Sequence, residues 1–421
     1  MFGPNSRAPA ALALFASALG LVFASYSTFD YAKHLDRRLH DVHCSFIPGL
    51  PATAEAEACR AAMYSPYSAL LREQYWGGIP ISLFALGAFI FFVGFSLYLL
   101  IAAGSAPRRA VVFFAVLSVT PLLVSLIMLG ISLTQLGELC NTCVGIYVSS
   151  FLLALGGLLN LLTLREPRVA PYPPALAGYD PRRDAVPAVS ARPQVSGLLP
   201  LAWLTAVALV TIVPSLVYAS TVPDHRPYLT KCGVIKQPDE KNDALVKIRS
   251  NRSIQSAMFF EDPLCPTCKA FHERLIQEDI FDKLNVQLVL FPLDSACNWM
   301  LDRPLHPGAC TVSKAVLCGG ERAREILEWA YSDQEYLTRA GKAGEPTLRA
   351  VIQERWGPDM IRCIDDRMTE VRLNRHLHFS SDNSIPVSTP QVYLGKQRIC
   401  DEDTDIGLRF TLGQLAPELL R

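Results

Sequence analysis

Residues 137–147 read GELCNTCVGIY, and the two cysteines, Cys140 and Cys143, lie between two long apolar runs. An apolar run of about 20 residues crosses a hydrocarbon core of about 30 Å as a helix, and the chain turns where two such runs meet. We therefore expect this CxxC pair at a membrane surface, at the start of a transmembrane helix.

The chain of 421 residues is half hydrophobic, and its 39 basic and 39 acidic residues give no charge argument for nucleic-acid binding. Nearly uncharged runs of membrane-spanning length cover residues 9–29, 79–103, 110–136, 144–163 and 197–219. We predict five transmembrane helices, with a four-helix core over residues 9–163 and a fifth helix over 197–219. A removable signal peptide is the alternative for the first run, because ASA at 16–18 resembles a cleavage site.

Basic residues set the predicted orientation. Arg108 and Arg109 follow the second run, and five more arginines lie in the Pro- and Ala-rich linker 164–196, which places both segments on the cytoplasmic side. The loop 30–78, the turn with Cys140 and the tail after residue 220 then lie outside. All twelve cysteines fall on that outer side, as an oxidising compartment predicts.

The tail carries a second CxxC motif between a predicted strand, residues 255–261, and a segment with apolar residues at helical spacing. Those apolar residues are Phe271, Leu275, Ile276, Ile280, Phe281 and Leu284. Cys265 would lie at the helix N-terminus, where unpaired N–H groups and the helix dipole stabilise a thiolate. Cys268 is placed to resolve a mixed disulfide. A zinc knuckle would need a second ligand pair, and no further CxxC follows.

The stretches FFEDPLCPTCKAFH (259–272) and Thr389-Pro390 followed by QVYLG are similar to those of thioredoxin-fold oxidoreductases with a helical insertion, over about residues 232–421. The resemblance implies a cis peptide bond at Pro390, with Thr389 and Pro390 contacting the substrate chain; Pro386 is the competing proline. The family's buried acid, six residues before the first cysteine, is replaced by Phe259. Glu261 is near but out of phase on the predicted strand.

Six further cysteines lie in the tail. Cys297 and Cys310 flank a loop that contains Pro and Gly, and we expect a structural disulfide there, worth about 3 kcal/mol by loop entropy. Three pairings stay open for the remaining four, which are Cys232, Cys318, Cys363 and Cys400. The tail histidines, His272, His306, His376 and His378, show no ligand-like grouping, so no metal site is predicted.

The helices before residue 163 resemble the vitamin K epoxide reductase family. The resemblance is carried by Cys44, CRAAMYSPYS (59–68), GGIPISLFALGAF (77–89) and CNTCVGIY (140–147). It implies that Cys143 passes electrons to a quinone and that Cys140 exchanges with the loop. It also implies that Cys59 attacks the Cys140–Cys143 disulfide and that Cys44 receives electrons from a thioredoxin-like partner.

Two further residues match family positions near the quinone. Ser65 lies six residues after Cys59, and Tyr147 lies four residues after Cys143, on the same helix face. A polar turn residue and an interfacial aromatic anchor are the structural alternatives for these two residues.

The predicted fold is therefore a membrane α-helical bundle followed by an α/β thioredoxin-like domain. The predicted activity is quinone-dependent formation of disulfides in secreted or periplasmic proteins, with ubiquinone or menaquinone as acceptor. The expected location is the bacterial inner membrane, with the thioredoxin-like domain on the periplasmic side. The alternatives are a disulfide reductase or isomerase whose redox state the membrane domain sets, and a thiol-rich metal-binding or anchoring protein.

Overall fold

A computed structural model describes residues 7–33, 62–63, 65–102, 106–136, 139–163 and 198–421. The chain divides into two compact units. The first contains the long apolar helices, and the second contains residues 222–421 together with residues 63–79. The loop cysteines Cys44 and Cys59 and the linker 164–196 lie outside the described residues.

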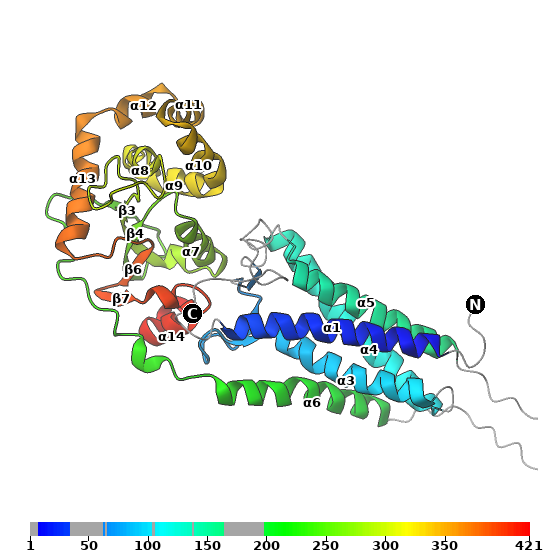
Figure 1. Cartoon of the computed structure of the whole chain (residues 1–421). Helices are drawn as coiled ribbons and strands as arrows, with labels where there is room; N and C mark the ends of the chain where they lie inside the picture. The colour runs from blue at the N-terminus through cyan, green and yellow to red at the C-terminus, as the bar shows by residue number, and fades with distance from the viewer. Residues whose placement is uncertain (1–6, 34–61, 64, 103–105, 137–138, 164–197) are drawn as a thin grey trace, which may run out of the picture. The chain divides into compact units, whose positions relative to one another are not determined.

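Among the described residues, five helices are long and apolar enough to cross a membrane, as the sequence predicts. They are α1 (Ala8–Lys33), α3 (Ile81–Ala102), α4 (Arg108–Ile131), α5 (Asn141–Leu162) and α6 (Leu198–Thr221) (Figure 1). A π-helical segment, η1 (Ser132–Leu136), continues α4. The chain is therefore a membrane protein.

The helices pack through small residues and aromatic rings. α4 lies along α5 and α3 along α6, and the rings of Phe92 and Phe114 meet edge to face at 5.6 Å. Gly145 lets α1 approach α5, because a Cβ there would come within 2.5 Å of the Phe23 ring. Ile127 and Phe151 are more than half exposed, as expected of side chains that face lipid.

The second unit is built on a five-stranded sheet with the order β3-β5-β4-β6-β7. The strands are β3 (Val246–Ile248), β4 (Gln255–Glu261), β5 (Leu284–Leu290), β6 (Gln391–Leu394) and β7 (Gln397–Ile399). β4 and β5 are parallel and joined by α7 (Pro266–Gln277), and β6 and β7 are antiparallel to their neighbours. A βαβ unit followed by a β-hairpin and a last helix, α14 (Leu408–Leu415), is the arrangement of the thioredoxin fold.

A helical insertion separates β5 from β6, as predicted (Figure 1). Its helices are α8 (Ala309–Cys318), α9 (Ala323–Ser332), α10 (Gln334–Ala343), α11 (Glu345–Trp356), α12 (Pro358–Ile364) and α13 (Arg367–Asp382). Short 3-10 turns, η2 (Arg226–Tyr228), η3 (Phe281–Lys283), η4 (Gly320–Arg322), η5 (Asp401–Asp403) and η6 (Pro417–Leu420), complete the unit.

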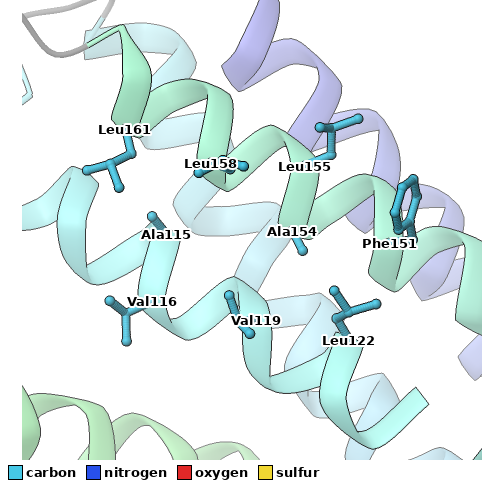
Figure 2. A pocket seen from close by; sticks show the side chains of 9 residues that line it. All are labelled: Ala115, Val116, Val119, Leu122, Phe151, Ala154, Leu155, Leu158 and Leu161. Atoms are coloured by element: carbon cyan, nitrogen blue, oxygen red, sulfur yellow. The ribbon is translucent and has the colours of Figure 1, made fainter. Parts of the chain in front are cut away.

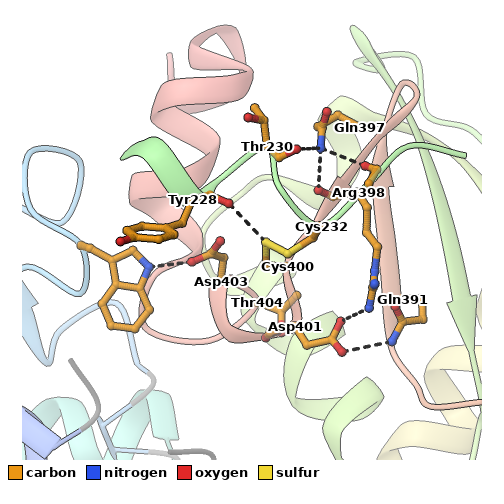
Figure 3. The surroundings of a disulfide bond; sticks show 12 residues. Tyr228, Thr230, Cys232, Gln391, Gln397, Arg398, Cys400, Asp401, Asp403 and Thr404 are labelled. Atoms are coloured by element: carbon orange, nitrogen blue, oxygen red, sulfur yellow. Dashed lines mark hydrogen bonds and ion pairs between the residues drawn. A yellow bond between two sulfur atoms is a disulfide. The ribbon is translucent and has the colours of Figure 1, made fainter. Parts of the chain in front are cut away.

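Three disulfides fix the tail. Cys297 pairs with Cys310, the pairing expected from the sequence. The four cysteines left open pair as Cys318–Cys363, which joins α8 to α12, and as Cys232–Cys400. Figure 3 shows the second of these bonds, which ties the start of the tail to the end of β7.

The helix that follows the tail CxxC is shorter than its apolar spacing suggests. α7 ends at Gln277, and Asp279 has a φ of 55°, a left-handed conformation that stops a helix. Ile280 and Phe281 are buried beyond that turn, and Leu284 opens β5. Their spacing reflects burial in the common core and not helix periodicity.

Candidate active site

The tail CxxC begins a helix in the way the sequence predicts. Cys265 is the N-cap residue of α7, with φ −79° and ψ 120°, and Pro266 occupies the first turn. Cys268 lies one turn into the helix and is fully buried, whereas Cys265 is 4% exposed. The two sulfurs are not joined in a disulfide. Cys265 is thus the sulfur nearer to solvent, as a nucleophile that meets another protein must be.

The pKa values of the two thiols are shifted in opposite directions. A hydrogen bond from the Cys268 thiol is the main factor that lowers the pKa of Cys265 to about 6. Burial is the main factor that raises the pKa of Cys268 well above its usual value. At neutral pH the pair therefore holds a thiolate at Cys265 and a thiol at Cys268.

The segment opposite the pair contains a cis peptide bond at Thr389–Pro390, and not at Pro386. The carbonyl oxygen of Thr389 lies 3.5 Å from the Cys265 sulfur. Pro390 directly precedes β6, which pairs with the central strand β4. The structure thus brings Cys265, Cys268, Thr389 and Pro390 together.

A buried acid lies near the pair, although the sequence offers none in the family position. Glu261 is fully buried at the end of β4, and its Oε2 accepts a hydrogen bond of 3.0 Å from the Tyr331 hydroxyl. Burial raises the pKa of Glu261 to about 7, and its charge interacts with those of Cys265 and His272.

The expectation that Glu261 is out of phase with Phe259 is wrong, because side chains alternate along a strand with a period of two and these two residues of β4 therefore share a face. The last five residues of β4 are all buried, since helices cover both faces of this central strand. The uninterrupted apolar run AMFF before Glu261 is the signal that could have shown this.

The turn between β4 and α7 is held by a second buried acid, Asp262. Its carboxylate accepts the N–H groups of Leu264, at 2.7 Å, and Leu293, at 2.8 Å, and contacts Nδ1 of His306 at 2.7 Å. Burial acts to lower the pKa of His306, but the Asp262 carboxylate outweighs it and raises that pKa. His306, for which the sequence predicts no role, thus lies among the charged groups around Cys265.

The membrane CxxC has the same local geometry. Cys140 is the N-cap of α5, with φ −75° and ψ 126°, and its carbonyl accepts the Val144 N–H at 3.0 Å. Cys140 is buried, Cys143 is half-buried, and neither is in a disulfide. The Cys140 sulfur lies 2.8 Å from the hydroxyl of Thr142, inside the CNTC motif. Each unit therefore presents one sulfur at a helix N-terminus and one a turn deeper.

Comparison with known proteins identifies the helical unit. Residues 11–156 match the model of the Vitamin K epoxide reductase family. Residues 11–156 form a vitamin K epoxide reductase family domain. No curated protein matches the chain.

Two solved structures are similar to the tail of the chain. One is a thioredoxin-like oxidoreductase from Silicibacter pomeroyi DSS-3, with 12% identity, 38% of this chain and 84% of that chain covered, and a TM-score of 0.27. The other is ScsC from Proteus mirabilis in a transitional conformation, with 16% identity, coverages of 41% and 76%, and a TM-score of 0.23. The chain therefore joins a vitamin K epoxide reductase family domain to a domain whose strands and helices have the thioredoxin-fold arrangement.

The other residues predicted in the vitamin K epoxide reductase family domain are only partly described. Tyr147 lies one turn after Cys143 on α5 and is half-buried. Ser65 is buried in the second compact unit, where its carbonyl accepts hydrogen bonds from the Ser68 N–H and hydroxyl. The roles of both residues at a quinone stay predictions.

An apolar groove of about 420 Å³ runs between α4 and α5 of the vitamin K epoxide reductase family domain (Figure 2). Its lining residues are Ala115, Val116, Val119, Leu122, Phe151, Ala154, Leu155, Leu158 and Leu161. These side chains carry no polar atoms, so the groove suits a lipid or isoprenoid chain and not the carbonyl groups of a quinone ring. Tyr147 and Cys143, the polar candidates on α5, lie outside this lining.

Proposed function

We propose that this protein oxidises thiols of secreted proteins and passes the electrons to a membrane quinone. Substrate thiols reduce the Cys265–Cys268 disulfide and are themselves joined in a disulfide. The resulting Cys265–Cys268 dithiol reduces the Cys44–Cys59 disulfide and is thereby reoxidised. The loop pair is reoxidised by Cys140–Cys143, and this last pair delivers two electrons and two protons to the quinone, giving a quinol. Each exchange between protein thiols breaks one disulfide and forms another. The last step forms the Cys140–Cys143 disulfide from two thiols, and the quinone takes up the two electrons and two protons released.

The observation that carries this proposal is the repeated geometry of the two CxxC pairs. Cys140 and Cys265 are both N-cap residues with nearly equal backbone angles, and each has a partner one turn deeper. One pair begins an apolar helix of a vitamin K epoxide reductase family domain, and the other faces a cis-proline segment in a thioredoxin-like domain. A relay from water-soluble thiols to a lipid-soluble acceptor needs one such pair in each medium.

The low pKa of Cys265 supports the oxidising direction. A stabilised thiolate favours the reduced form of the pair, and this makes its disulfide a stronger oxidant. The main contribution is the hydrogen bond from Cys268. A reduction potential of the CPTC pair near the roughly −120 mV of strong oxidants would support this direction, and one near the roughly −270 mV of thioredoxin would favour a reductase.

The test is quinone reduction by the purified full-length protein with a reduced dithiol substrate. Cys143→Ser and Cys140→Ser should each lower the rate at least about 100-fold, because no step can bypass the membrane pair. The control is Cys297→Ala/Cys310→Ala, which removes both sulfurs of a structural disulfide outside the relay and should keep the rate within about twofold. Reoxidation of the tail by quinone at the normal rate in Cys143→Ser would contradict the relay.

A further inference from the structure

Residues 63–79, here called the docking segment, belong to the same compact unit as the thioredoxin-like domain. The segment contains a short pair of strands, β1 (Ala69–Leu70) and β2 (Ile79–Pro80), and leads directly into α3 at Ile81. Tyr67, Leu70 and Leu71 are exposed, whereas Trp76 and the polar side chain of Arg72 are buried. Large side chains buried on a separate domain are the signature of a docked element.

Trp76 fills a site built by the end of the thioredoxin-like domain. Its ring is 2% exposed, and its Nε1 donates a hydrogen bond of 2.7 Å to Oδ1 of Asp403, which Figure 3 shows beside the Cys232–Cys400 disulfide. The His225 ring lies 4.9 Å from the indole, centre to centre. Gly407 completes the site, because a Cβ at that position would come within 2.2 Å of the indole Nε1.

Arg72 supplies a second anchor, at the end of α7. Its Nη2 lies 2.8 Å from Oε1 of Glu278, and the two side chains are 5% and 0% exposed. Glu278 also accepts from Arg274, at 3.1 Å, and lies 3.5 Å from Arg409. The segment therefore contributes one of three guanidinium groups around a fully buried carboxylate, and loss of any of them leaves that charge less compensated.

A third contact lies nearer to solvent. Glu73 forms an ion pair of 2.7 Å with Arg409, which thereby joins a segment residue to Glu278. The docking segment thus uses one aromatic anchor, one buried ion pair and one rim ion pair. These are the elements of a specific protein–protein interface, formed here between two parts of one chain.

The docking segment directly follows the loop that carries Cys59. Met63 lies four residues after Cys59, the loop cysteine of the proposed relay. We propose that the docking segment fastens the thioredoxin-like domain to the loop that carries Cys59, so that disulfide exchange between the loop and Cys265 is intramolecular. This inference rests on the function proposed above. Tethering two reacting groups by a short segment raises their effective concentration without any new contact at the reacting sulfurs.

The first experiment compares Trp76→Ala with Tyr67→Ala in the full-length protein. Tyr67 is an aromatic residue of the same segment but is 41% exposed, which makes it the matched control. We expect Trp76→Ala to slow quinone-dependent reoxidation of Cys265–Cys268 at least about tenfold, with Tyr67→Ala unchanged. Reaction of the CPTC disulfide with a small soluble dithiol, measured separately, should stay the same in both variants.

A cross-linked variant distinguishes loss of docking from loss of folding in Trp76→Ala. A Cβ at residue 413 would lie 4.0 Å from the Glu73 Cβ, within the range for a disulfide. Glu73→Cys/Gly413→Cys should therefore cross-link the segment to α14, as detected by mass spectrometry of the joined peptides. Adding this cross-link to Trp76→Ala should restore the reoxidation rate to within about threefold of the wild type.

The outcomes separate this inference from the proposed function. If the wild type transfers no electrons to quinone, the proposed function fails and this inference fails with it. If the wild type is active and uncross-linked Trp76→Ala is equally active, the docking segment does not fasten the domain and the inference is overturned. Failure of the cross-link to form, or to restore the rate of Trp76→Ala, would also overturn it.

Discussion

Cys265 and Cys268 lie three residues apart, yet their surroundings favour opposite protonation states. Cys265 accepts a hydrogen bond from the Cys268 thiol at a helix N-terminus, and Cys268 is enclosed by the core. The Cys265 sulfur is therefore the nucleophile. The Cys268 thiol stays protonated and attacks the mixed disulfide once it has formed. The difference follows from the hydrogen bond between the two thiols and from the burial of Cys268 one turn into α7.

The hydrogen bond between the thiols can be tested by alkylation of Cys265 as a function of pH. In the reduced protein the rate should rise through a midpoint of about 6. Cys268→Ala removes the donor and should move the midpoint upwards, whereas Cys268→Ser keeps a donor and should leave it within about half a unit of the wild type. Equal midpoints in the alanine and serine variants would show that the helix terminus alone lowers the pKa.

Because the pKa of Glu261 is raised, we expect the free energy of unfolding to depend on pH. Its pKa is raised by burial from 4.5 to about 7 in the folded protein. Since the neutral form is favoured in the folded state, its contribution is fully present below pH 4.5 and is lost as the pH rises to about 7. Glu261→Gln removes this loss, so the variant should gain about 3 kcal/mol over the wild type between these two pH values.

The measurement for Glu261→Gln is the urea dependence of Cys268 alkylation in the reduced protein, because Cys268 is fully buried and reacts only after unfolding. Wild type and variant are compared at the same pH, which cancels the pH dependence of the reagent. Glu335→Gln is a control, since Glu335 is an exposed glutamate on α10. A constant difference between wild type and Glu261→Gln from pH 4.5 to 7 would show that Glu261 does not titrate there.

At the scale of elements, the two disulfides of the insertion close loops of different length. Cys318–Cys363 closes 45 residues and joins two helices, whereas Cys297–Cys310 closes 13 residues in the loop after β5. Loop entropy gives about 4 kcal/mol for the first and about 3 kcal/mol for the second. Neither bond includes a sulfur of the CPTC motif.

Removing each pair by alanine substitution tests that order. Cys318→Ala/Cys363→Ala should lower the urea midpoint of the tail more than Cys297→Ala/Cys310→Ala, as followed by circular dichroism of the purified protein. Both variants should keep the alkylation midpoint of Cys265, because the helix N-terminus and Cys268 are unchanged. An inverted order of the two urea midpoints would mean that native-state packing, and not loop closure, sets the value of these bonds.

The sequence predicts the elements that depend on local patterns. Uncharged runs of membrane length are recognisable without a partner, and the five apolar helices follow from them. The N-cap positions of Cys140 and Cys265 are also predicted, because a CxxC motif directly before an amphipathic or apolar run indicates the start of a helix. The strand β3 was missed, since three residues carry too little periodicity.

Long-range partners could not be predicted in the same way. The pairings Cys232–Cys400 and Cys318–Cys363 depend on how the insertion folds back, and the burial of Glu261 depends on helices that come later in the chain. Tyr331, which hydrogen-bonds Glu261, is 70 residues away in the sequence. The same limit applies to Trp76, whose partner Asp403 is 327 residues away.

At the scale of the whole molecule, the number of spans decides which thiols can meet. If each apolar helix crosses the membrane once, two spans separate the loop before α3 from the turn before α5, and two more separate that turn from residue 222. An even number of crossings returns the chain to the same face. The three proposed relay pairs would therefore share one face whichever way the first helix is inserted.

This parity argument leads to a labelling experiment that also tests the orientation. Ser190→Cys places a thiol in the linker between α5 and α6, and Glu321→Cys places one at an exposed position of η4. The basic residues near α4 and in the linker predict a cytoplasmic linker. A membrane-impermeant maleimide should then label Glu321→Cys in intact spheroplasts of the expressing cells, and Ser190→Cys only after permeabilisation. Mass spectrometry assigns each label to its cysteine, which separates it from the native thiols. Labelling of both positions in intact cells would mean that α6 does not cross the membrane, and the thioredoxin-like domain would then lie on the side opposite to Cys140.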